Sequence, residues 1–246
     1  MKTIGLLGGM SWESTVTYYQ LLNEMVRECL GGLHSAEILL RSFDFAPIAE
    51  LQAEANWEEA GRLMVEAAVG LEKTGADCLL IGTNTMHICA DEVQAALSIP
   101  LFHIADVTAR AIQTSGCRSP LLLATRFTME KDFYRDRLRQ RHGIDVCVPE
   151  QNEREDVHRI IYDELCQGVI SPASKNRYLG IIEAARKRGA DGVIFGCTEV
   201  GLLISQNDIA LPAFNTTELH ARAAVDFALS RDLAPGRSND QGKEQQ

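Results

Sequence analysis

The chain repeats itself, and this repeat restricts the possible fold more than any other feature of the sequence. The run GADCLLIGTNTM (75–86) resembles GADGVIFGCTEV (189–200) at an offset of 114 residues. IPLFHIADVTARAI (99–112) resembles LPAFNTTELHARAAV (211–225), and IGLLGGM (4–10) resembles PLLLATR (120–126). Three pairs in the same order indicate an internal duplication. We therefore expect two similar halves related by a pseudo-twofold axis.

Within each half, short apolar runs alternate with longer helical patterns, which is typical of βαβ units. We expect strands at 3–7, 36–42, 77–82, 100–103, 119–124, 144–148, 191–196 and 211–214. Helix-start signals occur at Asn56 with Glu59, at Ser171 before Pro172, and at Thr216 or Thr217. The predicted fold class is α/β with parallel sheets. Its ligand site is expected in the cleft between the halves, at the carboxyl ends of the strands.

Charge and cysteine content exclude several classes of protein. The net charge of −10 over 246 residues gives no basic surface for nucleic acid or anionic membrane. Seven scattered cysteines form no CxxC pair, which indicates reduced thiols and a cytoplasmic location. No signal peptide or membrane span is expected. The polar segment 231–246 is predicted to be disordered.

Cys197 is the first candidate for chemistry, because it follows a buried strand and precedes a predicted helix start. A helix N-terminus lowers the pKa of a thiol and favours the reactive thiolate. The alternative is that Cys197 is a small buried hydrophobe, which is the interpretation given to the other six cysteines. In the other half the equivalent position is Thr83, so a hydroxyl stands where this half has a thiol.

Two loops supply further candidates. GTNTMH (82–87) contains more polar side chains than a helix N-cap needs, and its free backbone N–H groups suit a carboxylate. GGMSWEST (8–15) allows close approach of a ligand, or it is a tight strand–helix turn. It matches neither the dinucleotide-binding nor the Walker A pattern. No motif for pyridoxal phosphate, nucleotide or metal is present, so no cofactor is expected.

These motifs together resemble the aspartate/glutamate racemase family of cofactor-independent amino-acid racemases. GLLGGMSWEST, NTMH, GAD followed by GCTEV, and LPAFNTT carry the resemblance from residue 4 to about residue 225. It implies two pseudo-symmetric Rossmann-like domains with the active site between them, and usually a homodimer. We predict a first domain at 1–103 plus 216–230, with the last helix returning to it, and a second domain at 104–215.

The resemblance also implies an isomerase with a two-base mechanism, in which one cysteine removes the α-proton and a second protonates the opposite face. Cys197 matches the second-half cysteine, which would serve the L-isomer. The first-half cysteine falls on Thr83, where the sequence departs from the pattern. The positions that would bind a small amino-acid substrate are Met10, Gln52, Asn84, Thr85 and Thr198.

Thr83 makes the predicted chemistry asymmetric. A cysteine thiol can be poised near the working pH, whereas a threonine hydroxyl is a poor base that can still donate a proton. The main hypothesis is therefore an asymmetric racemase of aspartate, glutamate or a broader set of amino acids. The alternatives are a single-cysteine decarboxylase of the same superfamily and an amino-acid-binding protein that has lost turnover.

Overall fold

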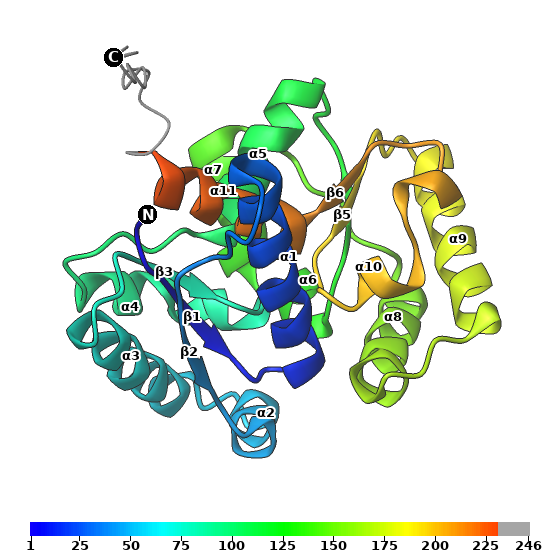
Figure 1. Ribbon diagram of the computed structural model, residues 1–246. Helices are drawn as coiled ribbons and strands as arrows, with labels where there is room; N and C mark the ends of the chain where they lie inside the picture. Colours follow the sequence, from blue (N-terminus) through cyan, green and yellow to red (C-terminus); the bar gives the residue numbers. More distant parts are fainter. Residues whose placement is uncertain (231–246) are drawn as a thin grey trace, which may run out of the picture.

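The computed structural model describes residues 1–230 as two α/β halves that lie side by side (Figure 1). Its strands are β1 (Ile4–Gly8), β2 (Ile38–Ser42), β3 (Cys78–Ile81), β4 (Leu121–Leu123), β5 (Val193–Phe195) and β6 (Ala213–Asn215). The helices of the first half are α1 (Trp12–Leu30), α2 (Phe45–Ala53), α3 (Trp57–Lys73), the 3-10 turn η1 (Thr85–Cys89) and α4 (Ala90–Ala95). The rest of the helices are α5 (Ile104–Ser115), α6 (Arg126–Glu130), α7 (Asp132–His142), α8 (Gln151–Asp163), η2 (Leu165–Gln167), α9 (Pro172–Lys187), α10 (Val200–Leu203), η3 (Gln206–Asp208) and α11 (Thr216–Leu229).

Both sheets are parallel and have the same topology, as the duplication predicts. The first has the order β2-β1-β3, and a bridge from Leu79 to Leu101 extends it. The second has the order β4-β5-β6, and a bridge from Leu121 to Cys147 extends it on the β4 side. Counting the bridging segment, each sheet therefore has four parallel segments in the same spatial order. The predicted strands at 100–103 and 144–148 are wrong in length, because each forms only an isolated bridge.

Helix starts follow the local capping residues. The Asn56 side chain accepts from the backbone N–H of Glu59 at the start of α3, as predicted. Ser171 precedes α9, which has Pro172 at its first position. The last helix begins one residue earlier than expected, because Asn215, not a threonine, accepts the first backbone N–H groups of α11. An Asn side chain fills this role as well as Ser or Thr.

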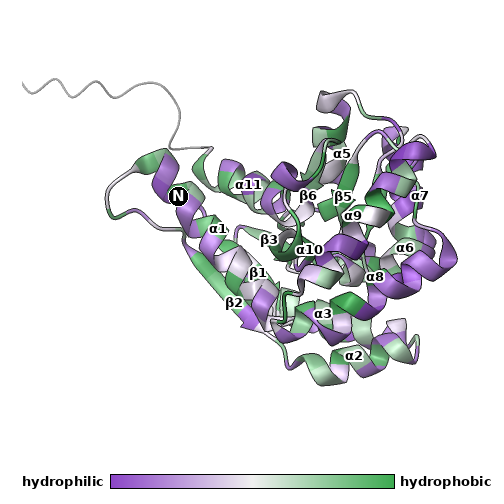
Figure 2. Ribbon diagram, turned by 90° about the vertical axis from the view of Figure 1, so that its right-hand side faces the viewer, coloured by the Kyte–Doolittle hydropathy of each residue, from purple (hydrophilic) through white to green (hydrophobic). Residues whose placement is uncertain are grey.

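Alternate residues of the first sheet enter two separate cores. Leu6 and Leu80 pack with α1 and α11 on one face, whereas Leu7 and Ile81 pack with α3 and α4 on the other. This is the period of two that a strand imposes on its side chains. Figure 2 shows the strands as predominantly hydrophobic, with hydrophilic residues on the outer faces of the helices. The second half has one continuous core around β4 and β5.

The helix at the end of each half crosses to its neighbour. Helix α11 follows β6 of the second sheet but packs on α1 and β3 of the first half, and α5 packs on both α11 and α7. The Tyr18 hydroxyl bonds His220 of α11 at 2.8 Å, and both side chains are fully buried. The domain boundaries at 103/104 and 215/216 stay a prediction. The tail 231–246 lies outside the described residues.

None of the helices in residues 1–230 combines the length and the apolar content that crossing a membrane needs.

Candidate active site

Two glycines bring the predicted catalytic positions to the sheet edges. Gly82 and Gly196 directly follow β3 and β5, and each donates its N–H at 2.8 Å to a carbonyl of the neighbouring strand, Leu7 or Leu123. A side chain would not fit there, because a Cβ on Gly82 would lie 3.0 Å from the Leu7 carbonyl oxygen and one on Gly196 would lie 2.6 Å from a Leu122 methyl. The next residue in each half therefore enters the space between the sheets.

A single hollow of about 370 Å³, including the part open to solvent, contains all seven residues predicted from the sequence. These are Met10, Gln52, Thr83, Asn84, Thr85, Cys197 and Thr198. Seven further lining residues were not predicted as site residues: Phe45, Thr125, Ile161, Tyr162, Cys166, Gly196 and Glu199. Both halves thus line one space, although the role of each residue stays a prediction.

Glu199 is the main addition to the site. Its carboxylate is 3% exposed and accepts hydrogen bonds from the hydroxyls of Ser11 (2.8 Å) and Ser14 (2.7 Å) at the start of α1. Its other oxygen accepts from the Cys197 thiol at 2.8 Å. The Cys166 thiol lies 3.6 Å from the oxygen that the serines contact. One carboxylate therefore connects the first half to two thiols of the second.

The surroundings of Cys197 keep the proton on its sulfur. Burial and the Glu199 carboxylate raise the pKa of the Cys197 thiol well above its ordinary value. The expectation of a lowered pKa is therefore wrong. The physical reason is that α10 is a single turn, Val200–Leu203, whose dipole is small beside a full negative charge at hydrogen-bond distance.

The contact between Glu199 and the two serines has an equivalent in the first half, where all the groups involved are neutral hydroxyls. Thr85, the equivalent of Glu199 at the offset of 114 residues, contacts the hydroxyls of Thr125 (3.0 Å) and Thr128 (3.4 Å) at the start of α6. This threonine pair corresponds to the serine pair at the start of α1 at the same offset. The cross-contacts between the halves are thus symmetric in position but not in charge, because only one of them contains a carboxylate.

Asn84 provides a buried acceptor in the wall of the hollow. Its amide nitrogen donates to the Thr216 hydroxyl at 3.0 Å, whereas its buried oxygen has no hydrogen-bond partner within residues 1–230. A buried polar atom without a partner is costly, so a donor from a ligand would be favoured here. Thr198 is 5% exposed and accepts a hydrogen bond from Thr217 at 3.1 Å.

The two remaining predicted residues, Gln52 and Met10, are also buried in the lining of the hollow. Gln52 of α2 is 2% exposed, and its oxygen accepts from the Tyr162 hydroxyl of α8 at 3.1 Å. Its amide nitrogen donates to the Met86 sulfur at 3.2 Å. A neutral pair, one side chain from each half, therefore connects α2 to α8 across the hollow.

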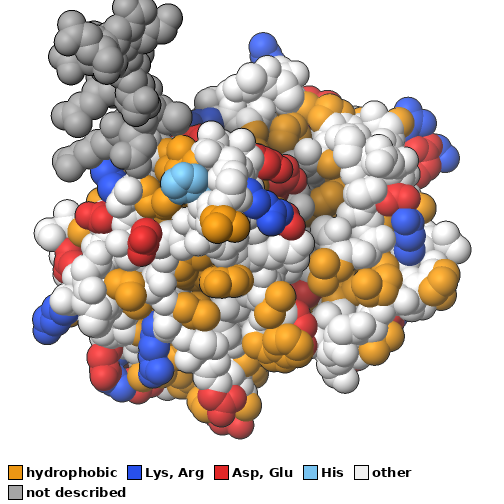
Figure 3. All heavy atoms as spheres, in the orientation of Figure 1, with side chains coloured by type: hydrophobic (Ala, Val, Ile, Leu, Met, Phe, Trp, Pro, Cys, Tyr) orange, Lys and Arg blue, Asp and Glu red, His pale blue; other side chains and the backbone are white. Residues whose placement is uncertain are grey.

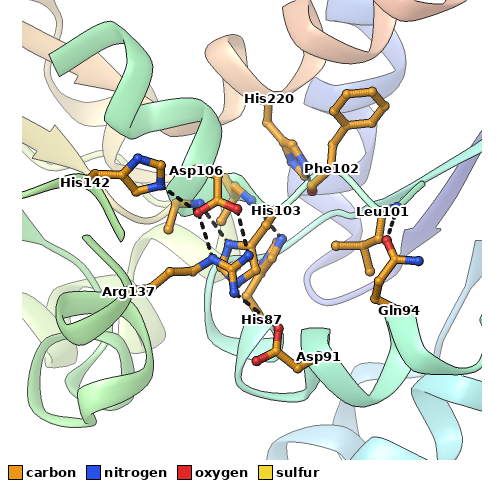
Figure 4. Close-up of polar contacts among 12 residues, drawn as sticks. His87, Asp91, Gln94, Leu101, Phe102, His103, Asp106, Arg137, His142 and His220 are labelled. Atoms are coloured by element: carbon orange, nitrogen blue, oxygen red, sulfur yellow. Dashed lines mark hydrogen bonds and ion pairs between the residues drawn. The ribbon is translucent and has the colours of Figure 1, made fainter. Parts of the chain in front are cut away.

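Figure 4 shows three buried histidines, His87, His103 and His220, close to one another, and the first of them bonds the Thr83 loop. The backbone N–H of Ile104 donates to His87 Nε2 at 3.2 Å, so the proton of the neutral ring is on Nδ1. This Nδ1–H donates to the Thr83 carbonyl at 2.8 Å. His87 therefore fixes the backbone of Thr83 rather than its hydroxyl, and no other side chain of residues 1–230 bonds that hydroxyl.

The other two histidines continue this buried group. The ring of His103 lies 4.7 Å from that of His87, and the ring of His220 lies 5.6 Å from it. Burial lowers the pKa of both His103 and His220 to about 3, and it lowers the pKa of His87 well below its ordinary value. Beside them, the Arg137 guanidinium makes a two-point contact with the Asp106 carboxylate. The group is therefore uncharged at its centre.

Comparison with known proteins gives a consistent result. Residues 7–224 match the sequence profile of the Asp/Glu/Hydantoin racemase family. A candidate Asp/Glu racemase from Yersinia pestis is 50% identical, with a TM-score of 0.87 over 93% of this chain and 100% of that one. An aspartate racemase homologue from Pyrococcus horikoshii is 36% identical, with a TM-score of 0.82 over 93% and 99%. The broad specificity amino-acid racemase RacX of Bacillus subtilis is 21% identical over 92% of this chain and 98% of its own.

The buried histidines predict acid sensitivity. Because their pKa values are lowered in the folded state, the unfolded chain binds more protons below about pH 6.5. The free energy of unfolding should therefore be nearly unaffected by them above about pH 7. It should begin to fall between about pH 7 and 6 and approach a loss of about 1.4 kcal/mol per pH unit for each histidine below about pH 5.5. Urea unfolding at pH 7, 6 and 5 measures this slope, and His103→Gln should reduce it. A free energy independent of pH over this range would contradict the assignment.

Proposed function

The chain belongs to the Asp/Glu/Hydantoin racemase family and is an isomerase, and we propose that it racemises free amino acids by transferring the α-proton without a cofactor. The observation that supports this most is the hydrogen bond from the Cys197 thiol to the buried Glu199 carboxylate, in a hollow that Thr83 enters from the other half. A thiol beside a proton acceptor is the arrangement that general-base chemistry needs.

In this proposal the substrate satisfies the unpaired groups of the hollow. Its ammonium donates to the free oxygen of Asn84, and its α-carboxylate accepts from the hydroxyls of Thr85 and Thr198. Met10 and Gln52 contact the rest of the molecule. The positive ammonium offsets the Glu199 charge and stabilises a thiolate, so binding favours the form of Cys197 that the chemistry requires.

Proton transfer then follows in a balanced sequence. The Cys197 proton moves to Glu199, and the resulting thiolate removes the α-proton from the L-face. The carbanion receives a proton on the opposite face from the Thr83 hydroxyl, directly or through water, and solvent replaces that proton. Return of the Glu199 proton to solvent restores the site. The Thr83 step is slow, because a hydroxyl without a base beside it is a weak proton-transfer group.

A separate group of exposed residues on α1 suggests how the protein associates. Trp12, Val16 and Tyr19 recur at helical spacing on α1 and are 65%, 53% and 56% exposed. Figure 3 shows hydrophobic side chains gathered on the face over α1. A stripe of this kind commonly marks an interface. We propose that the protein is a cytoplasmic homodimer in which α1 contacts its equivalent in a second copy.

Removing either member of the Cys197–Glu199 pair should stop proton transfer. Cys197→Ala should abolish exchange of the α-proton of the L-substrate in deuterated water, and Glu199→Gln should slow it by about 100-fold or more. Both variants should still be stabilised by substrate against thermal unfolding. Cys29→Ala and Glu183→Gln, which change an exposed thiol and a half-exposed carboxylate on the surface of α9, are the matched controls. Retention of most activity in Cys197→Ala would refute the assignment.

Thr83 predicts unequal exchange from the two enantiomers. Racemisation has an equilibrium constant of one, so kcat/KM must be the same in both directions whatever the residues. The partial reactions are free to differ. The L-substrate should lose its α-proton to solvent about 10-fold or more faster than it racemises, whereas the D-substrate should exchange slowly. Thr83→Cys should raise racemisation in both directions and D-side exchange with it. Similar exchange rates for both enantiomers in the wild-type protein would contradict this account.

Charges on the α1 stripe should separate the proposed dimer. Val16→Glu and Tyr19→Glu place a carboxylate on the exposed stripe without disturbing the buried face of α1. Both variants should be monomers by light scattering at concentrations where the wild-type protein has the mass of a dimer. Thr114→Glu, on an exposed position of α5, should remain a dimer. A wild-type monomer, or charged variants with unchanged mass, would exclude this interface.

A further inference from the structure

The proposed substrate hollow contains one charged side chain, and that side chain is an anion. Of the fourteen lining residues, thirteen are uncharged types and the fourteenth is Glu199. No Lys or Arg is among these lining residues. Arg41 is exposed and lines a separate hollow, and Lys131 is exposed at the start of α7. Arg126 lies near Tyr162, but its side chain is exposed.

The lining divides according to the elements that carry it. The loops that follow the strands bring the hydroxyl and amide groups to which the proposed function assigns the substrate backbone. Helices α2 and α8 bring Phe45, Gln52, Ile161 and Tyr162. Together with Met10, Thr125 and Cys166, these four are the groups left to contact the side chain of an amino acid. They present apolar surfaces, a hydroxyl, a thiol and one neutral hydrogen-bonded pair, and none of them is a cation.

The Gln52–Tyr162 pair suits a neutral polar group. The Gln52 oxygen is already bonded to the Tyr162 hydroxyl at 3.1 Å, and the amide nitrogen has a thioether, a weak acceptor, as its partner. The amide therefore has a strong hydrogen-bond donor that a substrate oxygen can use. The tyrosine is no source of charge, because burial raises the pKa of its hydroxyl.

Electrostatics then separates acidic substrates from neutral ones. An amino acid with an uncharged side chain enters as a zwitterion and leaves the net charge of the hollow unchanged. An acidic one brings one negative charge that its own ammonium does not offset, into a hollow that already contains the Glu199 carboxylate and is lined largely by buried groups. Burying a like charge without a cation is unfavourable, and the repulsion is strengthened where water is excluded.

We propose that this site takes amino acids with uncharged side chains in preference to aspartate and glutamate, and that Gln52 is the residue that sets this preference. The inference deepens the proposed racemase function and rests on it. It concerns the side chain alone and is independent of how the proton crosses between Cys197 and Thr83.

Two isosteric pairs test the proposal directly. L-glutamine differs from L-glutamate, and L-asparagine from L-aspartate, only in the charge and donor capacity of the side chain. The kcat/KM for α-proton exchange in deuterated water should be at least 10-fold higher for each amide than for its acid. A smaller ratio in either pair overturns the proposal. Absence of exchange with a full panel of amino acids would instead refute the racemase function itself.

Substitutions of Gln52 test whether this residue sets the preference for uncharged side chains. Gln52→Arg should move the amide-to-acid ratio at least 10-fold toward the acids, because it adds a cation to the wall of the hollow. Gln52→Glu, which keeps the shape of the side chain, should lower the rates with the acids further. Gln151→Arg adds the same charge at an exposed position of α8 and should leave the ratio unchanged. An unaltered ratio in a folded Gln52→Arg protein would overturn the assignment of Gln52, and the wild-type comparison holds whether or not that variant folds.

Discussion

The Glu199 carboxylate accepts hydrogen bonds from two serines of one half and a thiol of the other, and the arrangement of the site depends on this contact. A buried carboxylate needs donors, and Ser11 and Ser14 at the start of α1 supply them. The same contact holds the start of α1 in the first half next to the loop after β5 in the second half. It also keeps Cys197 protonated at rest, so the proposed chemistry waits for a substrate whose ammonium changes the local charge.

The internal duplication explains why both halves contribute equivalent positions to the site, and the substitutions at those positions explain why the site is asymmetric. The two sheets have one topology, and in each a glycine after a strand is followed by a residue that lines the same hollow, Thr83 or Cys197. The symmetry fails at two equivalent pairs of positions. Thr83 stands opposite Cys197, and Thr85 opposite Glu199, so one half has a thiol with a carboxylate where the other has two hydroxyls. The thiol and the carboxylate that the proposed mechanism uses for proton abstraction thus both come from the second half.

The sequence predicted features that arise locally and missed those that arise between the halves. The repeat and the alternation of apolar runs predicted the sheets, and residues directly after strands, such as Thr83 and Cys197, were placed together correctly. Tyr162 and Cys166 come from helix α8 and the turn after it, and no spacing rule connects them to a strand end. Glu199 was visible two residues after Cys197, but its serine partners lie over 180 residues away. The prediction for the pKa of Cys197 was wrong because the sequence shows neither that α10 is a single turn nor that the Glu199 carboxylate turns back to contact the thiol.

The protonated resting state of Cys197 can be measured through the pH dependence of its alkylation. Iodoacetamide reacts with the thiolate, so the rate of labelling of the peptide that contains Cys197, followed by mass spectrometry, reports the pKa of this one thiol. The account predicts a midpoint above the value of about 8.5 for a free cysteine, and a lower midpoint in Glu199→Gln. A wild-type midpoint below 8.5, or one that Glu199→Gln leaves unchanged, would contradict it.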